Sequence, residues 1–563
     1  MACRRRVILP FACIFIFFAA IAAKLFLLQV WYHDELNDRA QKIVCKELRE
    51  LPCRGMIFDR NGKILSMSVK TYLIFLDFKQ IKNIEEIKSA LRENNIHLTD
   101  KLLAGKTNSS YVPVAENIDM DTASRIRQLN LPGVGFTTKY VRKYPEGKMA
   151  SHILGLVGRD GYGLEGIEYV ANSYLSGEKV KELRVRDGRG RTISSNIENA
   201  DDYRGSDVYL TIDSNLQFIA EQEIEKAWKE SRSKKAIAIV QNPVTGEILA
   251  MAIRPNFDPA DFSGSWENIR NPAVCDVFEP GSTFKMITSA AALEENVVKR
   301  SEVIWCENGR YKIYDHTITD HEKKGLLTFD EVIEYSSNIG TAKIGMRIGK
   351  EKFYSYIKQF GFHSLTGIDL PGEAKGLLKS PNDWSGLSLP VISFGQEVGV
   401  TAIQMVNAYS ALANGGDLIE PKVISEIKTP TGEVLYKDEK RIIRRAVSSK
   451  VAAELREMLQ GTVDKGTGRL AGVPGYSIGG KTGTAQKRDK RTGRYSSSCY
   501  VASFCGIAPL KNPRVTIFVV LDEPQGDYWA SSRAAPVFAR IASRSLQYMR
   551  VPPDNESLHL VKK

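Results

Sequence analysis

The sequence has few of the residues that build metal sites and no pattern that groups them. It contains 7 histidines and 8 cysteines, and no two cysteines form a C-x-x-C pair. A cysteine-built zinc site is therefore not expected, because such sites draw ligand pairs from short spacings. His316 and His321 stand five residues apart, which on a helix would turn them in different directions, and no third ligand accompanies them. The sequence predicts neither a metal nor a cofactor.

The sequence also lacks a fixed-period repeat, a low-complexity segment and any nucleic-acid-binding motif. Its net charge of +12 and its pI of about 9.1 could suit a polyanion. The basic residues, however, are scattered or stand in short polar runs such as 487–494, which are typical of solvated loops. An anionic lipid or an anionic wall polymer is the expected neighbour of this charge, and nucleic acid is not.

One long apolar run is present, and it lies at the N-terminus. Residues 7–30 carry a single charge, Lys24, and follow three arginines at 4–6. The run is long enough to cross a bilayer core of about 30 Å. The preceding arginines predict a cytoplasmic N-terminus and an exported remainder after about residue 32. A cleaved signal peptide is the alternative, because A-I-A at 20–22 resembles a cleavage site, and it exports the same residues.

The region from 33 to about 205 predicts an α+β unit without catalytic chemistry. Residues 33–53 read as a polar helix, and 54–66 hold two apolar runs around D-R-N-G, which is a hairpin pattern. Two helix-like stretches between short strands occupy 85–131. Cys45 and Cys53 could form a local disulfide in an exported chain, although spacing does not fix connectivity.

The pattern changes near residue 205. A strand is followed by a predicted N-cap at Asp213 and an amphipathic helix, and residues 235–253 form a clear hairpin. A helical middle runs to about 420, and strands return at 476–487, 498–509 and 514–524. Strands that bracket a helical insert predict an α/β domain whose antiparallel sheet is built from both chain ends.

The pair Ser282 and Lys285 is the first candidate for chemistry. The S-x-x-K spacing is weak alone, because it also begins at Ser176, Ser231 and Ser355. Those copies read as a turn, a polar linker and a surface helix. Only the first pair enters an apolar helix through Pro-Gly, so both side chains share one face of the first turn. The helix dipole and burial both lower a lysine's pKa, as a lysine base requires.

Two further patterns follow along the chain. Ser336 and Asn338 offer a hydroxyl and a carboxamide at the end of a helix-like stretch. Lys481, Thr482 and Gly483 form a K-T-G that occurs once, after two glycines, on a predicted strand. Alternation would point Lys481 and Gly483 to one face, and the glycines indicate that another element approaches the strand closely.

S-x-x-K, S-x-N and K-T-G in this order resemble the penicillin-binding proteins and serine β-lactamases. The resemblance to the class B, monofunctional penicillin-binding proteins extends from residue 1 to about 547. It leans toward the division-specific septal branch, and the elongation-specific branch stays open. The further stretches that carry it are 54–66, 163–169, 210–217, 242–252 and 394–416.

The resemblance implies a D,D-transpeptidase that crosslinks peptidoglycan stem peptides through an acyl-enzyme on Ser282, releasing D-Ala. Lys285 is the implied base, Ser336 the proton relay to the leaving amine, and Asn338 a ligand of the donor peptide. The implied oxyanion hole is made by the backbone N–H groups of Ser282 and Thr484. The implied substrate-binding residues are Lys481, Thr482, Gly483 and Thr484. β-Lactams would acylate the same serine.

The same resemblance implies an α/β protein with a transmembrane helix, an elongated α+β pedestal, and a transpeptidase domain with an antiparallel sheet flanked by helices. Its implied place is the inner membrane, crossed once, with the catalytic domain outside. Implied partners are the divisome's membrane-embedded glycosyltransferase and other division proteins. The expected boundaries are 1–32 for the stub and anchor, 33–205 for the pedestal, 206–550 for the transpeptidase domain and 551–563 for the tail.

Three alternatives use the same residues differently. A β-lactamase or β-lactam sensor shares S-x-x-K and K-T-G but does not need the region before residue 205. A D,D-carboxypeptidase differs in passing the acyl group to water. A non-catalytic wall-binding scaffold would be free to lose at least one motif residue, whereas all six of the motif side chains are intact.

Overall fold

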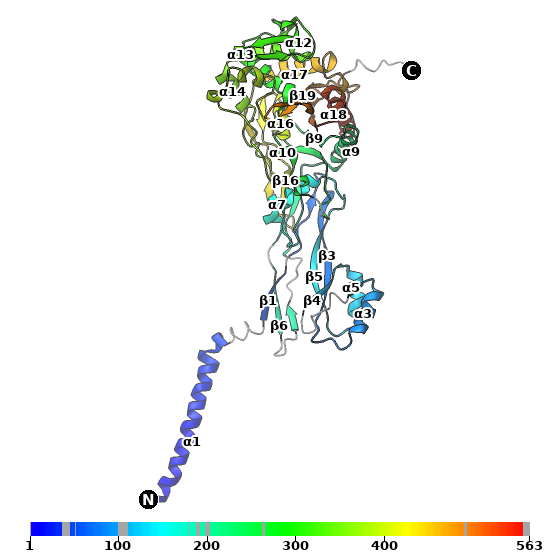
Figure 1. Cartoon of the computed structure of the whole chain (residues 1–563). Coiled ribbons are helices and arrows are strands. Elements are labelled where there is room, and N and C mark those ends of the chain that lie inside the picture. The colour runs from blue at the N-terminus through cyan, green and yellow to red at the C-terminus, as the bar shows by residue number, and fades with distance from the viewer. Residues whose placement is uncertain are drawn as a thin grey trace.

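The N-terminal segment is a single long helix. A computed structural model describes residues 2–36, 45–50, 52–99, 111–177, 180–186, 192–196, 203–261, 265–488 and 493–555. Helix α1, Ala2–Phe26, continues into a π-helical turn, Leu27–Trp31 (Figure 1). The window Ile14–Trp31 has a mean hydropathy of 2.2, and none of it is buried against protein. It is therefore a candidate membrane span by length and composition.

The prediction that 33–53 is helical is wrong where the structure describes its second half. Strand β1, Cys45–Glu50, pairs antiparallel with β6, Val180–Arg186, which pairs with β7, Thr192–Asn196. Local periodicity misses this strand because its partner comes from a distant part of the chain. Residues 37–44 and the Cys45 side chain lie outside the described part, so a Cys45–Cys53 pair stays a prediction.

The predicted hairpin at 54–66 is confirmed, and it starts a long twisted sheet. Strand β2, Ile57–Phe58, pairs with β3, Ile64–Leu76, which also pairs with β4, Val112–Ile118, and β5, Val134–Lys143. The two predicted helices are present as α3, Ile84–Glu93, and α5, Met120–Gln128. They lie beside β3 and β4 in Figure 1, over a small apolar cluster that includes Ile74, Ile87 and Ile126.

The same sheet continues toward the catalytic region. Strand β8, Asp207–Leu210, runs parallel to β2 and antiparallel to β16, Ile424–Lys428, and β17, Val434–Lys437, follows β16. One sheet thus unites the N-terminal hairpin, the strand near residue 205 and a hairpin from far along the chain. It runs from the long lower strands β3 and β5 up to β16 at the narrow waist below the globular part (Figure 1).

The second sheet is antiparallel and built from both chain ends, as predicted. Its order is β10, β9, β21, β20, β19, so β19 is an edge strand. Alternation along β9 sends Ala236, Ala238 and Val240 toward one apolar cluster and Ile237 and Ile239 toward another. The bounds are Lys235–Gln241 for β9, Ile248–Arg254 for β10, Gly479–Arg488 for β19, Tyr495–Ala508 for β20 and Val515–Asp522 for β21.

Helices cover both faces of this sheet. Helices α9, Ser214–Ser231, and α18, Ala530–Tyr548, pack on one face. Helices α11, Lys285–Glu294, and α16, Ala402–Ala413, belong to the cluster on the other face. The predicted N-cap is confirmed, because the Asp213 carboxylate accepts hydrogen bonds from Asn215 N and Leu216 N.

The remaining elements are mostly short, apart from the 16-residue helix α17. His316 lies in a strand, so the helical spacing argument made for the two histidines does not apply. The other helices are α6 Ser151–Leu154, α7 Gly166–Val170, α8 Asn172–Leu175, α10 Pro272–Cys275, α12 Phe329–Glu334, α13 Asn338–Ile348, α14 Lys350–Gln359, α15 Ser388–Ser393 and α17 Ser449–Asp464. The other strands are β11 Val303–Trp305, β12 Arg310–Ile313, β13 His316–Thr319, β14 Leu326–Thr328, β15 Asp417–Ile419 and β18 Ile442–Arg445.

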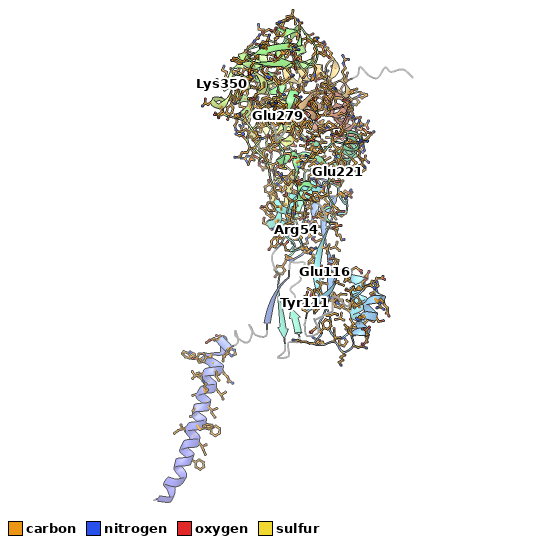
Figure 2. All side chains as sticks on the ribbon, in the orientation of Figure 1. Arg54, Tyr111, Glu116, Glu221, Glu279 and Lys350 are labelled. Atoms are coloured by element: carbon orange, nitrogen blue, oxygen red, sulfur yellow. The ribbon has the colours of Figure 1, made fainter. Side chains whose placement is uncertain are left out.

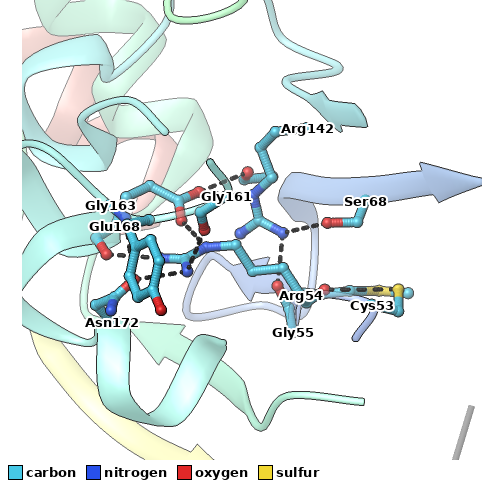
Figure 3. Close-up of polar contacts among 12 residues, drawn as sticks. Cys53, Arg54, Gly55, Ser68, Arg142, Gly161, Gly163, Glu168 and Asn172 are labelled. Atoms are coloured by element: carbon cyan, nitrogen blue, oxygen red, sulfur yellow. Dashed lines mark hydrogen bonds and ion pairs between the residues drawn. The ribbon is translucent and has the colours of Figure 1, made fainter. Parts of the chain in front are cut away.

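A buried charged cluster fixes the waist. The Glu168 carboxylate, with no exposed surface, accepts from Arg54 Nε at 2.6 Å, Arg142 Nε at 2.7 Å and Ser66 Oγ at 3.0 Å (Figure 3). The two guanidinium groups also bind backbone oxygens, Arg54 that of Glu168 and Arg142 that of Gly55. Burial raises the pKa of Glu168, but the arginines overcome this and hold it below its ordinary value.

Candidate active site

Ser282 lies in a tight turn that is held from two sides. The 3₁₀ turn Gly281–Phe284 runs directly into α11, and Lys285 N donates to Ser282 O. Gly281 has a φ of +56°, and its N–H donates to Gly395 O at 3.0 Å. A Cβ on Gly395 would stand 2.1 Å from Gly281 O, and one on Gly281 would stand 3.1 Å from Ala485 Cβ. The two glycines let this turn approach both neighbours closely.

Lys285 begins α11 and has no exposed surface. Its Nζ donates to Ser336 O at 2.6 Å, to Ser336 Oγ at 3.2 Å and to Asn338 Oδ1 at 2.8 Å. The structure therefore brings the first two predicted motifs together. Burial lowers the pKa of Lys285 to about 7, against a smaller opposing effect from the Asp320 carboxylate. All of these hydrogen-bond acceptors are uncharged, so no direct contact with a carboxylate offsets the lowering of the Lys285 pKa by burial.

Ser336 lies just after the end of α12, as predicted, and Asn338 is the first residue of α13. Ser336 joins α12 to α13 with a φ of +61°, a left-handed conformation that a serine rarely adopts. Ser337 caps α13 by accepting from Gly340 N at 2.9 Å. Asp320 holds this turn by accepting from Ser337 Oγ at 2.5 Å, Asn338 N at 2.5 Å and Ile339 N at 3.0 Å.

The K-T-G segment lies on edge strand β19, which packs against the serine turn. A Cβ on Gly483 would stand 2.7 Å from Pro280 O, which confirms that another element approaches this strand closely. Lys481 has no exposed surface and Thr482 is 7% exposed. Burial, and then the charge of Lys285, lower the pKa of Lys481 well below its ordinary value.

Strand alternation, unless broken by a twist or bulge, predicts opposite faces for Lys481 and Thr482, and the lysine side chain modifies this picture. Lys481 and Thr482 were expected on opposite faces, but Lys481 Nζ lies 3.4 Å from Thr482 Oγ1. The four-carbon lysine side chain is long enough to return to its neighbour's hydroxyl. Thr484 Oγ1 accepts from Ala530 N at 3.1 Å, which ties the strand to the start of α18. The backbone N–H groups of Ser282 and Thr484 remain the predicted oxyanion donors.

Sequence reasoning missed two residues of this cleft. Asp320 was not among the predicted residues, because it stands 18 residues before Asn338, the first residue of α13, and so gives no local capping signal. Thr467, on the loop after α17, lies with its Oγ1 2.9 Å from Thr482 Oγ1. Its flanking glycines, Gly466 and Gly468, are the only sequence signal that this loop is closely packed.

The reading of Ser231 as part of a polar linker is wrong. Ser231 is the last residue of α9 and is 2% exposed, and its Oγ donates to Ala227 O at 2.6 Å. That hydroxyl is thereby satisfied within its own helix. Among the S-x-x-K copies whose serine and lysine both lie in the described part of the chain, the one at Ser282 combines a half-buried serine with a fully buried lysine at a helix start, and the copies at Ser231 and Ser355 do not.

The arrangement defines a class of enzyme. The site combines the features of a serine acyltransferase. These features are a serine at a helix start, a buried lysine without a contacting carboxylate, a second serine within reach of that lysine, and an edge strand. The edge strand can pair with an extended peptide substrate while the lysine accepts the serine proton.

Comparison with known proteins identifies the family. The family described as penicillin binding protein transpeptidase domain matches residues 236–543, and penicillin-binding protein dimerisation domain matches 49–210. Stage V sporulation protein D of Bacillus subtilis is 35% identical over 96% of this chain and 85% of its own length. Peptidoglycan D,D-transpeptidase FtsI of Buchnera aphidicola subsp. Schizaphis graminum is 32% identical over 96% of this chain and 94% of its own.

Solved structures agree. Penicillin-binding protein 3 of Mycobacterium tuberculosis in complex with aztreonam is similar with a TM-score of 0.71 and 29% identity, covering 90% of this chain and 98% of that one. A peptidoglycan synthetase of Bifidobacterium adolescentis gives 0.73 and 26%, covering 91% and 98%. This chain belongs to the class B penicillin-binding proteins, which confirms the family resemblance and the expected fold class.

Proposed function

We propose that this protein is a peptidoglycan D,D-transpeptidase that crosslinks stem peptides through an acyl-enzyme on Ser282. Its relatives support the activity, because one relative that aligns over nearly its full length is named a peptidoglycan D,D-transpeptidase. The observation that carries the assignment to these residues is Lys285, a fully buried lysine whose pKa of about 7 makes a neutral amine available near neutral pH.

In the proposed first step, Ser282 Oγ attacks the carbonyl carbon of the D-Ala–D-Ala bond while neutral Lys285 takes its proton. The Oγ–C bond forms, the C–N bond breaks, and the terminal D-Ala leaves with a proton passed through Ser336, whose Oγ lies 3.2 Å from Lys285 Nζ. In the second step an amine of another stem peptide attacks the ester carbonyl, so that a new C–N bond forms, the Oγ–C bond breaks, and the proton that the amine loses returns to Ser282 Oγ.

The substrate lies along the edge strand in this proposal. Lys481 and Thr482 hold the terminal carboxylate, and Asn338 binds the donor peptide. The carbonyl oxygen sits between the backbone N–H groups of Ser282 and Thr484, where each donor typically contributes about 3 kcal/mol to the transition state. The contact between the serine turn and β19 supports this, because Ser282 belongs to that turn and Thr484 belongs to that strand.

The cellular setting is proposed on coarser grounds. The apolar helix α1 anchors the chain in the inner membrane once, with the arginines at 4–6 inside and the catalytic domain outside. A relative named for sporulation and one named peptidoglycan D,D-transpeptidase FtsI support a role in septal wall synthesis. The proposed partners are a membrane-embedded glycosyltransferase and other divisome proteins, and the proposed domain bounds are 1–32, 33–205, 206–550 and 551–563.

The test is the intact mass of the purified full-length chain in detergent after brief exposure to benzylpenicillin. We expect the mass to rise by one drug molecule and to stay raised, and we expect no adduct on a Ser282→Ala variant. Hydrolysis of the drug without a lasting adduct would favour a β-lactamase instead. An unmodified protein beside intact drug would leave only a non-catalytic scaffold.

A further inference from the structure

Lys481 is a buried lysine whose oxygen partners within the described residues are few and distant. Its Nζ lies 3.4 Å from Thr467 Oγ1, 3.4 Å from Thr482 Oγ1 and 3.5 Å from Thr482 O. All three distances are at the long end of the hydrogen-bond range. A charge held this loosely in a buried site depends strongly on each acceptor, because losing one leaves desolvation uncompensated.

The loop that carries Thr467 is fixed from both sides of the cleft. Thr467 N donates to the backbone oxygen of Glu334 at 3.2 Å, two residues before Ser336. A Cβ on Gly466 would stand only 2.2 Å from that oxygen, so the glycine is what allows the approach. The Gly468 N–H donates to Thr462 O at 2.9 Å. Thr467 is thus tied to the S-x-N side by its backbone and to the K-T-G side by its hydroxyl.

The two threonine hydroxyls and the ammonium form a closed triangle. Thr467 Oγ1 and Thr482 Oγ1 are 2.9 Å apart, and each lies 3.4 Å from Lys481 Nζ. The ammonium can only donate, so it uses a lone pair of each hydroxyl. One hydroxyl hydrogen fills the contact between the threonines, and one hydroxyl hydrogen is left over. If Thr467 donates to Thr482, the Thr482 hydrogen remains free to point into the cleft.

We infer that Thr467 is a positioning residue for recognition of the substrate carboxylate. It donates its hydrogen to Thr482 Oγ1 and accepts from Lys481, so that Thr482 presents a polarised O–H and Lys481 an ammonium to one carboxylate. This inference rests on the proposed function, in which Lys481 and Thr482 bind that carboxylate. Thr467 acts through these two residues and not by touching the reacting atoms.

The direction of the hydroxyl chain makes the effect specific. Hydrogen bonds in series polarise one another, and a bond from an ionised group to a carboxylate is about twice as strong as a neutral one. Removing the Thr467 hydroxyl therefore weakens carboxylate binding, while attack by Ser282 on a ligand without a carboxylate is little affected. Substrate binding should change more than the chemical step, so KM should rise by a larger factor than the factor by which kcat falls.

The experiment compares acylation of the full-length chain by benzylpenicillin and by benzylpenicillin methyl ester, whose carboxylate is masked. The readout is the second-order rate constant for benzylpenicillin divided by the second-order rate constant for its methyl ester. We expect Thr467→Val to lower this ratio about fivefold, in line with the loss of one hydrogen bond, and Thr467→Ser to restore it. Thr467→Ala replaces the valine variant if the valine does not fold.

Thr516→Val is the matched control. Thr516 is a fully buried threonine in β21 of the same sheet, and its hydroxyl makes no hydrogen bond within the described residues. It should leave the ratio unchanged. If both rates fall equally in Thr467→Val, or neither changes, the positioning role is wrong and the proposed function stands. If the wild type is not acylated at all, the proposed function fails and this inference fails with it.

Discussion

The waist and the catalytic cleft both bury cationic side chains, but they compensate them differently. At the waist, Arg54 and Arg142 are each 6% exposed and share the fully buried Glu168 carboxylate. In the cleft, Lys285 and Lys481 have no exposed surface, and their hydrogen-bond acceptors are uncharged oxygens. Figure 2 places Arg54 at the narrow waist and Glu279, three residues before Ser282, in the globular part.

This difference separates an architectural site from a reactive one. Ion pairing with Glu168 keeps charge in place and holds three chain segments together, and the pKa of Glu168 falls below its ordinary value. Burial without a contacting carboxylate lowers the pKa of Lys285 to about 7, so its proton is mobile near neutral pH. In the proposed mechanism the same fold thus uses buried charge once for position and once for proton transfer.

The largest expected effect comes from removing the mobile proton acceptor. Lys285→Met keeps the side-chain length and removes the amine, so acylation by benzylpenicillin should fall by about a thousandfold or more. The melting temperature should not fall, because the variant no longer buries an amine. Rates are measured by stopped-flow with a fluorescent penicillin.

The control for this variant is Lys350→Met. Lys350 is likewise the first residue of a helix, α14, but its side chain is 45% exposed. Its acylation rate should match the wild type. A Lys285→Met protein that acylates within tenfold of the wild type would show that another group takes the proton.

The architectural site predicts a large effect on stability instead. Glu168→Gln leaves two buried guanidinium groups without a carboxylate, and breaking such a buried cluster costs about 3–5 kcal/mol of unfolding free energy. The molecules that remain folded should still be acylated at the wild-type rate. Urea unfolding followed by circular dichroism measures the first quantity, and penicillin labelling of the folded fraction measures the second.

Glu223→Gln is the matched variant for this comparison. Glu223 also binds two arginines, Arg540 at 2.6 Å and Arg544 at 2.8 Å, but both arginine side chains are 37% exposed. Solvent screening reduces the expected loss to about 1 kcal/mol or less. Equal losses for the two variants would contradict the idea that burial gives the waist cluster its importance.

The smallest expected effect is a shift in pH dependence. Acylation should rise with pH through about 7, because only neutral Lys285 accepts the serine proton. The Asp320 carboxylate favours the ammonium and raises this pKa, so Asp320→Asn should move the midpoint to lower pH. The measurement is the acylation rate constant from pH 5.5 to 8.5.

Glu322→Gln controls for the loss of any nearby negative charge. Glu322 is exposed and pairs with Lys324 at 3.0 Å. Its removal should leave the midpoint where it is in the wild type. A midpoint that moves upward in Asp320→Asn would show that the sign of this electrostatic effect is wrong.

The sequence predicted those parts of the fold whose signal is local. The hairpins at 54–66 and 235–253, the helix capped by Asp213 and the antiparallel sheet from both chain ends were all readable from alternation and turn residues. Strand β1 was not, because the strand that stabilises it lies far along the chain. The union of β8 with β16 across the waist also depends on distant pairing.

The residues of the site also divide into those that local sequence patterns predicted and those that only distant contacts revealed. Motif order identified the residues that meet in the cleft, and the structure joins Lys285 to Ser336 and Asn338 as the motifs suggested. Thr467 and Asp320 act by holding motif residues from outside any motif, so only three-dimensional contacts reveal them. Burial sets the pKa of Lys285, and burial is a property of packing that the S-x-x-K spacing does not contain.

The most direct test of this account is the titration of the Lys285 side chain itself. The full-length chain is labelled with ¹³Cε-lysine, and the Lys285 signal is assigned by its loss in Lys285→Met. The account predicts that this signal titrates with a midpoint near 7, far below the ordinary lysine value of about 10.4. A Lys285 midpoint near that ordinary value would contradict the claim that burial without a contacting carboxylate prepares this lysine as the base.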